Sequence, residues 1–231
     1  MIQVTDLKKQ YKEVVVLDVE RLAIPKSECF GLVGNNGAGK TTLFRIMLDL
    51  VRASQGKVEI DSQDVSKSEE WKRTTGAYLD EHMLLSYLTA DEYFQTLRKI
   101  YGLSEADLQL HLDKFTELFN EEIVGKKKYI RDLSKGNLKK VGVAAAMMGN
   151  PEVVFLDEPF ENLDPSSQIR LKKLILQEKG NSQVTFLISS HDLNHVTEIC
   201  DRIVLLEKGK IINDLRDKSA MLAELDAYFT G

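Results

Sequence analysis

Short apolar runs alternate with stretches of helical periodicity along most of this chain. The apolar runs of strand length are residues 2–7, 14–19, 29–33, 57–60, 76–79, 153–156, 184–189, 202–206 and 210–212. The run at 29–33 leads into a glycine-rich loop and then a helix expected over about residues 39–50. In the last third of the chain, Asp164 and Pro165 begin another expected helix. Strands that alternate with helices predict a mainly parallel α/β sheet.

The middle of the chain has the period of helices instead. Thr89 and Glu92 have the spacing of a capping box, and Ser104 precedes a second helix. The apolar residues that recur at helical spacing here are Phe94, Leu97, Tyr101, Leu108, Leu112, Phe115 and Phe119. We therefore expect residues 83–149 to form a helical insert between two parts of one α/β core, residues 1–82 and 150–231.

Composition narrows the class of protein. The chain has 231 residues, 43% of them hydrophobic, which is enough for one domain with a sizeable core. Its net charge of -5 argues against nucleic acid as the main partner. The longest apolar run, residues 143–148, is far shorter than the roughly 18 residues of a membrane-spanning helix, and the N-terminus has no apolar secretion signal, so we expect no direct membrane insertion. Cys29 and Cys200 lack a metal-binding spacing and are expected to be buried thiols.

The glycine-rich loop carries the first candidate chemistry. The residues of GNNGAGKTT are Gly34, Asn35, Asn36, Gly37, Ala38, Gly39, Lys40, Thr41 and Thr42. They match the pattern GxxxxGK[ST], in which glycines let backbone N–H groups face phosphate oxygens at a helix N-terminus. We expect Lys40 to contact the β and γ phosphates of a nucleotide, and Thr41 to offer its hydroxyl to Mg²⁺. A glycine-rich turn that only begins a helix is the alternative.

A second set of candidate residues follows two apolar strands in the last third of the chain. The sequence VVFLDEP places Asp157 and Glu158 at the end of one strand, and LISSHDL places His191 just after another. Because the carboxyl ends of parallel strands meet at one sheet edge, we expect these residues to converge on the glycine loop. There Asp157 would bind Mg²⁺, Glu158 would act on water as a general base, and His191 would contact the γ phosphate. Each segment taken alone also fits a strand end with a turn or a cap.

Two further segments, LSKGNLKK at residues 133–140 and ENLDP at 161–165, lie among these motifs. With GNNGAGKTT, VVFLDEP and LISSHDL in this order, the chain resembles the ATP-binding subunit of an ATP-binding cassette (ABC) transporter over essentially its whole length. The resemblance implies an α/β fold: a P-loop NTPase core with a mainly parallel sheet, an N-terminal antiparallel β subdomain and a helical subdomain that carries the signature motif LSKGN. It also implies hydrolysis of ATP with Mg²⁺.

The resemblance gives further residues a role by position. Ser134 and Gly136 belong to the signature, which in this family caps the γ phosphate of ATP bound by a second subunit. Tyr11 matches the aromatic residue that stacks on adenine, and Asp164 matches an acid that acts across the dimer. Without the resemblance, each residue also has a local interpretation. Ser134 would cap an amphipathic helix, Tyr11 would be a packing residue, and Asp164 would be the N-cap of a helix.

One position departs from the family pattern. After the strand at 76–79 the family commonly has Pro-Gln, with the Gln near Mg²⁺ and the membrane partner, whereas this chain has Asp80 and Glu81. A carboxylate is a hard oxygen ligand, so Glu81 is expected to replace the amide at the metal. The alternative is a solvated loop carboxylate with no coupling role.

The resemblance also predicts partners and a place of action. We expect two ATP molecules to be held between two such subunits, head to tail, and their hydrolysis to power a separate transmembrane permease. The form of the signature and Glu81 favour export. The subunit would be cytoplasmic and peripheral, held at the membrane through the permease. A soluble ABC ATPase of a cytosolic assembly complex is the open alternative, whereas the signature and Glu158 argue against a P-loop kinase.

Overall fold

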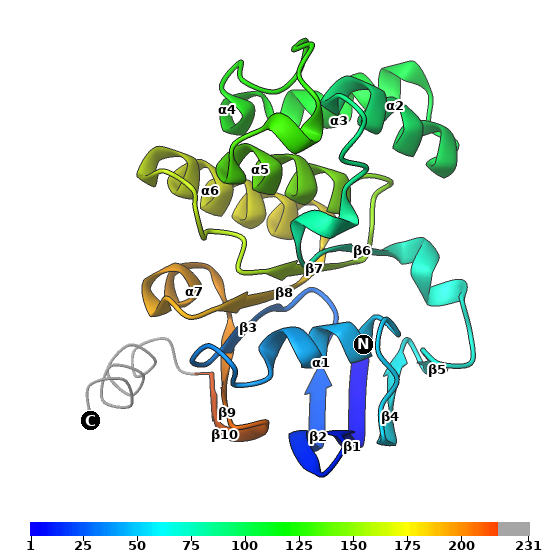
Figure 1. Ribbon diagram of the computed structural model, residues 1–231, viewed down its shortest axis with the longest axis vertical. Coiled ribbons are helices and arrows are strands. Elements are labelled where there is room, and N and C mark those ends of the chain that lie inside the picture. The colour runs from blue at the N-terminus through cyan, green and yellow to red at the C-terminus, as the bar shows by residue number, and fades with distance from the viewer. Residues whose placement is uncertain (217–231) are drawn as a thin grey trace.

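The computed structural model describes residues 1–216 and builds them around a six-stranded sheet with the order β10-β9-β3-β8-β7-β6 (Figure 1). Its strands are β3 (Cys29–Val33), β6 (Thr75–Tyr78), β7 (Val153–Asp157), β8 (Thr185–Ser190), β9 (Arg202–Glu207) and β10 (Lys210–Leu215). Neighbouring strands from β9 to β6 pair in parallel, and β10 pairs antiparallel with β9. β3, β7 and β8 are buried at every position, as in a parallel sheet covered on both faces. The expected mainly parallel α/β core is confirmed.

A second, antiparallel sheet has the order β2-β1-β4-β5. Its strands are β1 (Ile2–Tyr11), β2 (Val14–Ile24), β4 (Gln55–Ile60) and β5 (Gln63–Asp64). The helix α1 (Lys40–Met47) packs between this sheet and the larger one, because buried Phe44 belongs to the same core cluster as Val4 of β1 and meets Phe155 of β7 edge to face at 5.4 Å. The expected N-terminal antiparallel β unit is therefore present.

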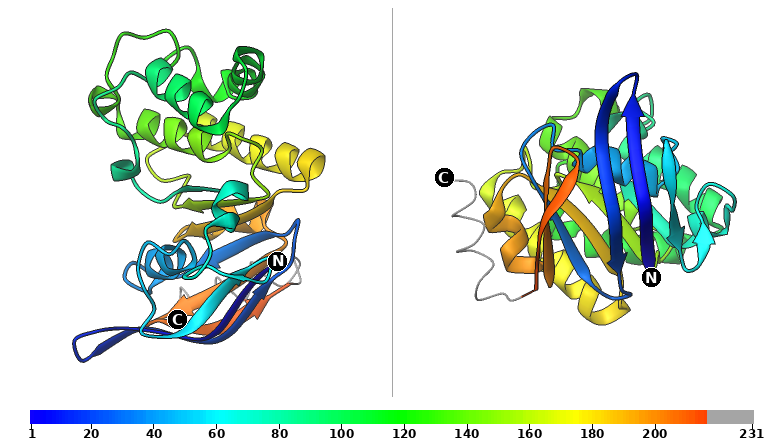
Figure 2. Two further views of the ribbon diagram at one scale, coloured as in Figure 1. Left: turned by 90° about the vertical axis from the view of Figure 1, so that its right-hand side faces the viewer. Right: turned by 90° about the horizontal axis from the view of Figure 1, so that it is seen from below.

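The other face of the larger sheet is covered by helices, on the side away from the antiparallel sheet (Figure 2). The α-helices here are α2 (Ala90–Tyr101), α3 (Glu105–Lys114), α4 (Thr116–Phe119), α5 (Lys135–Ala146), α6 (Pro165–Ser182) and α7 (Leu193–Ile199). Short 3₁₀ turns are η1 (Glu70–Thr74), η2 (Glu81–Met83) and η3 (Ile130–Asp132). Four of the α-helices, α2 to α5, fall within residues 83–149. The division into subdomains is still a prediction, and residues 217–231 of the predicted core lie outside the described part.

Local signals account for most helix starts. Thr89 forms a full capping box with Glu92, and the side chains of Ser134 and Asp164 accept hydrogen bonds as N-caps of α5 and α6. The single 3.6-residue period from Leu108 to Phe119 is divided, because α3 ends at Lys114 and α4 begins at Thr116. The apolar face nevertheless continues across the break, since Phe115 is fully buried against the rings of His111 and Phe119.

The helix α5 lies unusually close to β6. A Cβ atom on Gly142 of α5 would lie 2.1 Å from the ring of Tyr78, and one on Gly76 of β6 would lie 1.7 Å from the carbonyl oxygen of Ala146. Only glycine at both positions permits this approach. The contact fixes α5 against the strand that leads to Glu81.

Two further expectations concern the cysteines and membrane-spanning helices. Cys29 and Cys200 are free thiols, both fully buried, as predicted. Within residues 1–216 no helix has the length and apolar character needed to cross a bilayer.

Candidate functional site

The predicted site residues follow the carboxyl ends of adjacent parallel strands. The glycine loop follows β3, His191 follows β8, Glu158 follows β7, and Asp80 lies two residues after β6. These four strands are neighbours in the larger sheet. Because parallel strands end at the same edge, the loops after them share one crevice, where ligands of open α/β sheets bind.

The glycine loop has the conformation that its sequence predicts. Gly37 and Gly39 have φ angles of +83° and +109°, and Gly39 is the N-cap residue of α1, whose first residue is Lys40. Gly34 is required for a different reason, since a Cβ there would lie 2.3 Å from the carbonyl oxygen of Leu206. The loop therefore presents backbone N–H groups and the positive end of a helix to the crevice.

A pocket of about 280 Å³ lies over this loop, and its wall consists of Tyr11, Val16, residues 35–42 and Glu158. Tyr11 is 51% exposed at the end of β1, and the ammonium of Lys9 lies 4.7 Å from its ring centroid. A larger hollow of about 370 Å³, lined by Lys26 and Glu152 among others, lies at the opposite ends of β7 and β8. None of the predicted site residues lines that larger hollow. A choice of site by cavity volume alone would therefore have pointed to the opposite end of the sheet.

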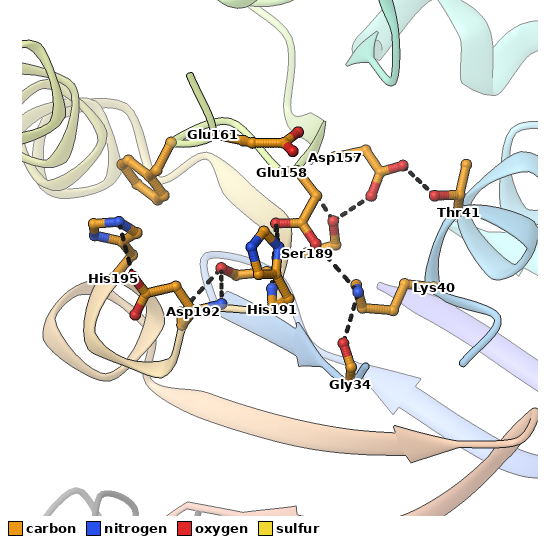
Figure 3. Close-up of polar contacts among 12 residues, drawn as sticks. Gly34, Lys40, Thr41, Asp157, Glu158, Glu161, Ser189, His191, Asp192 and His195 are labelled. Atoms are coloured by element: carbon orange, nitrogen blue, oxygen red, sulfur yellow. Dashed lines mark hydrogen bonds and ion pairs between the residues drawn. The ribbon is translucent and has the colours of Figure 1, made fainter. Parts of the chain in front are cut away.

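Lys40, Glu158 and His191 meet at the centre of the crevice (Figure 3). The ammonium of Lys40 donates to the carbonyl oxygen of Gly34 at 2.7 Å and lies 3.1 Å from Oε1 of Glu158. Nδ1 of His191 lies 2.9 Å from Oε2 of Glu158, and the backbone N–H of His191 donates to the same oxygen at 3.2 Å. Glu158 thus links the lysine of the glycine loop to the histidine that follows the neighbouring strand β8, a contact that the sequence alone does not specify.

Asp157 forms a second centre beside the first. Its Oδ2 accepts a hydrogen bond from Thr41 Oγ1 at 2.5 Å, and its Oδ1 accepts one from the hydroxyl of Ser189. Burial raises the pKa of Asp157, and the two hydroxyl hydrogen bonds oppose that rise. The paired threonine hydroxyl and carboxylate offer hard oxygens, the ligands that Mg²⁺ prefers.

Ser189 is a site residue that the sequence reasoning missed. Its hydroxyl donates to Asp157 and also accepts the backbone N–H of Glu158 at 2.9 Å. The strand β8 lies between β3 and β7, and Ser189 pairs in register with Asp157. The Ser-Ser pair before His191 is the sequence feature that could have indicated this role. Hydroxyl groups at the end of an apolar strand need a hydrogen-bond partner when they are buried.

The signature residues lie outside the hydrogen-bonded cluster. Ser134 caps α5 by accepting the backbone N–H of Asn137 at 3.2 Å. Gly136 is next to the backbone of Asn162, where a Cβ would lie 2.8 Å from the carbonyl oxygen. Asp164 caps α6 and accepts bonds from Ser166 and Ser167, which hold the pKa of Asp164 below its usual range. The capping roles of Ser134 and Asp164 considered from the residues alone are therefore present.

Glu81 is exposed at the start of η2. In the described part of the chain, no hydrogen bond or ion pair joins it to Thr41 or Asp157. The neighbouring Asp80 is held more firmly, since it pairs with Arg45 at 2.9 Å and accepts the backbone N–H of His82. The predicted metal contact of Glu81 thus has no support in this geometry and stays a prediction.

The donor set fits Mg²⁺ and a nucleotide. Among residues 1–216, no three His, Cys, Asp or Glu side chains are grouped to hold a metal by themselves. A site with one hydroxyl and one carboxylate suits Mg²⁺, which usually keeps several waters and binds substrate phosphates as well. The glycine loop, Lys40 and the half-exposed Tyr11 line the pocket beside this donor set and are the remaining residues predicted to bind a nucleotide.

A glycine-rich loop of the phosphate-binding type after β3, together with an Asp-Glu pair at the carboxyl end of β7, defines a P-loop ATPase domain. Residues 17–161 match the family model described as ABC transporter, and the chain belongs to that family as an ATP-binding subunit. An uncharacterized ABC transporter ATP-binding protein of Synechocystis sp. is 36% identical, over 83% of this chain and 54% of the relative, so this chain spans about half of that protein. The bacitracin transport ATP-binding protein BcrA of Enterococcus faecalis is 31% identical, over 93% of this chain and 69% of its own length. A solved ATP-binding subunit of an ABC transporter superimposes with a TM-score of 0.87 at 26% identity and full coverage of both chains.

Proposed function

We propose that this chain hydrolyses ATP to drive transport by a separate membrane permease. The observation that carries the proposal is the convergence of Lys40, Glu158 and His191 beside the glycine loop. A site for nucleotide binding alone needs the loop and the lysine. The carboxylate of Glu158, placed between a cation and an imidazole, supplies the group that hydrolysis needs in addition.

Each residue has a defined part in this proposal. The N–H groups of the glycine loop and Lys40 bind the phosphates, and Tyr11 stacks on the base. Thr41 and Asp157 hold Mg²⁺, which supplies charge neutralisation at the β and γ phosphates when bound. Glu158 accepts a proton from the attacking water, while His191 orients the Glu158 carboxylate and contacts the γ phosphate.

The complete site requires a second copy of the chain. The signature residues Ser134 and Gly136 are not part of the cluster around Lys40, yet Ser134 begins a helix whose positive end suits an anion. We therefore propose a head-to-tail dimer with two ATP molecules, each held by the loop of one copy and the signature of the other. Asp164 lies close to that interface in this arrangement.

The permease and the direction of transport are further parts of the proposal. The relative BcrA is described as a bacitracin transport ATP-binding protein, which supports a role in transport. Export is proposed from the form of the signature and from Glu81. The segment around Glu81 and the helices of residues 83–149 are the proposed docking face for the permease. The subunit then acts at the cytoplasmic face of the membrane.

The decisive experiment compares Glu158→Gln and Lys40→Ala with the parent protein. Glu158→Gln is expected to bind Mg·ATP and to elute as a dimer in size-exclusion chromatography, because it cannot complete hydrolysis. Lys40→Ala is expected to remain monomeric and inactive. A folded Glu158→Gln protein that turns over ATP at the parent rate would contradict the proposal.

A second measurement separates the transporter from a soluble assembly ATPase. The chain is expected to sediment with membranes from a native lysate and to be released when the permease gene is deleted. Recovery only in the supernatant, bound to a soluble complex, would favour the assembly ATPase.

A further inference from the structure

A lysine of α5 lies against the backbone of Glu158. The ammonium of Lys139 donates to the carbonyl oxygen of Glu158 at 2.6 Å and lies 3.8 Å from the carboxylate of Glu161. Its side chain is only 12% exposed. Burial lowers the pKa of Lys139, and the charges of nearby carboxylates, among them Glu161 and Glu158, oppose that change. A buried cation that faces several acids and a main-chain oxygen is held in one place.

The backbone of Glu158 needs such support. Its φ angle is +48°, in the left-handed region that a non-glycine residue adopts at a cost of order 1–3 kcal/mol. The hydroxyl of Ser189 binds its N–H, and Glu161 N–H reaches its carbonyl oxygen at 3.2 Å. The bond from Lys139 is shorter and carries a charge, so it is the strongest of the contacts to this carbonyl.

Lys139 also joins two parts of the proposed machinery. It lies five residues after Ser134, roughly 7.5 Å along the axis of α5. The helix itself is fixed to β6 through Gly142 and Tyr78. A movement of α5 relative to the sheet would therefore displace the backbone of Glu158 through the hydrogen bond from Lys139.

We propose that Lys139 is a positioning residue for ATP hydrolysis. Its ammonium holds the Glu158 backbone in the strained conformation that turns the carboxylate toward Lys40 and His191. Through the same bond, the position of the signature helix governs the position of the base. This inference rests on the proposed role of Glu158 as the general base.

The experiment measures steady-state ATP hydrolysis and ATP-dependent dimer formation for three variants. Lys139→Met removes the charge and the donor, and its kcat is expected to fall about tenfold or more, since small displacements of a catalytic group have effects of this size. Its KM is expected to change less than about threefold, because the phosphate contacts remain. Lys139→Arg keeps charge and donor and is expected to recover most of the kcat. Lys114→Met, which removes a half-exposed lysine of α3 paired with Glu178, is the matched control and is expected to keep the parent kcat.

Dimer formation separates positioning of Glu158 from a general weakening of α5. Lys139→Met is expected to accumulate the ATP-bound dimer, as Glu158→Gln does. A folded Lys139→Met protein with the parent kcat would overturn the inference. So would one that fails to dimerise where Glu158→Gln dimerises, because that result would place the effect in the signature. If Glu158→Gln itself keeps the parent turnover, the proposed function of Glu158 fails instead.

A further variant covers the case in which Lys139→Met does not fold. Lys139→Gln keeps an amide donor without the charge and is compared with Lys139→Arg. A kcat at least about fivefold lower for Gln than for Arg supports the inference, since charge strengthens this hydrogen bond. Equal kcat values in the two folded variants would overturn it.

Discussion

The ammonium of Lys40 and the carboxylate of Glu158 form an ion pair of 3.1 Å at the mouth of the glycine loop. The two side chains are 6% and 18% exposed, so their charges are poorly screened by solvent. Lys40 is the residue proposed to bind the β and γ phosphates, and Glu158 is the proposed base. If these proposed roles hold, the nucleotide and the base share one cation, and we expect the phosphates and Glu158 to compete for Lys40.

The shared cation leads to a prediction for nucleotide affinity. Glu158→Gln removes the charge that competes with phosphate for Lys40, so the Kd for ATP is expected to fall by about three- to tenfold, which corresponds to roughly 0.7–1.4 kcal/mol. Isothermal titration calorimetry of the monomeric protein, below the concentration at which it dimerises, measures this change. Glu161→Gln, which removes a half-exposed carboxylate nearby, serves as the control and is expected to leave the Kd unchanged. Weaker binding by Glu158→Gln would show that the pair organises the site for ATP.

Glu81 provides a test of coupling to the permease. If its carboxylate replaces the glutamine of related subunits, Glu81→Gln is expected to keep hydrolysis within about tenfold, or roughly 1.4 kcal/mol of barrier. Glu81→Ala is expected to lose permease-stimulated turnover more than basal turnover. Rates measured with and without reconstituted permease decide this. Parent-like rates of Glu81→Ala under both conditions would identify a solvated loop residue with no coupling role.

The stability of the helical region is expected to depend on pH through His111. Burial lowers the pKa of this imidazole, although its hydrogen bond with the carbonyl oxygen of Ala144 acts in the opposite direction. The unfolded chain takes up the proton near pH 6.5, whereas the folded chain takes it up only at a lower pH, so stability falls as the pH drops below about 6.5. His111→Gln cannot titrate and is expected to lose less unfolding free energy than the parent between about pH 7.5 and 5.5. Urea unfolding at both pH values measures the difference, and equal losses would contradict the assignment.

Two glycine substitutions are expected to change the stability of the protein in opposite directions, because only one of them lies where α5 closely approaches β6. Gly142→Ala places a methyl group against the ring of Tyr78 and is expected to destabilise the protein by about 1–3 kcal/mol. At Gly180 in α6 an added methyl group meets nothing within 4 Å apart from its chain neighbours and the nearby backbone of its own helix, so Gly180→Ala is expected to stabilise the protein by about 0.5–1 kcal/mol. Unfolding in urea gives both values. Equal and small changes would mean that α5 can shift away from the sheet without loss.

The sequence by itself determined the features that depend on a few neighbouring residues. The glycine loop at 34–39, the caps at Thr89, Ser134 and Asp164, and the apolar strands predicted at 153–156 and 184–189 are each specified within a short stretch of chain. Backbone conformation and capping depend on local sterics and hydrogen bonds, so the residue types are sufficient to predict them. The family order of the motifs then predicted which strand ends meet.

Only the tertiary structure decided which side chains touch. The order of strands places β8 between β3 and β7, and this order alone brings Ser189 to Asp157 and His191 to Glu158. The bond from Lys139 to Glu158 likewise depends on how far α5 approaches the sheet. Such contacts join residues 19 to 33 positions apart. These contacts depend on the packing of the whole core. A close-packed interior has few voids, so each helix and strand fits in only one position relative to its neighbours.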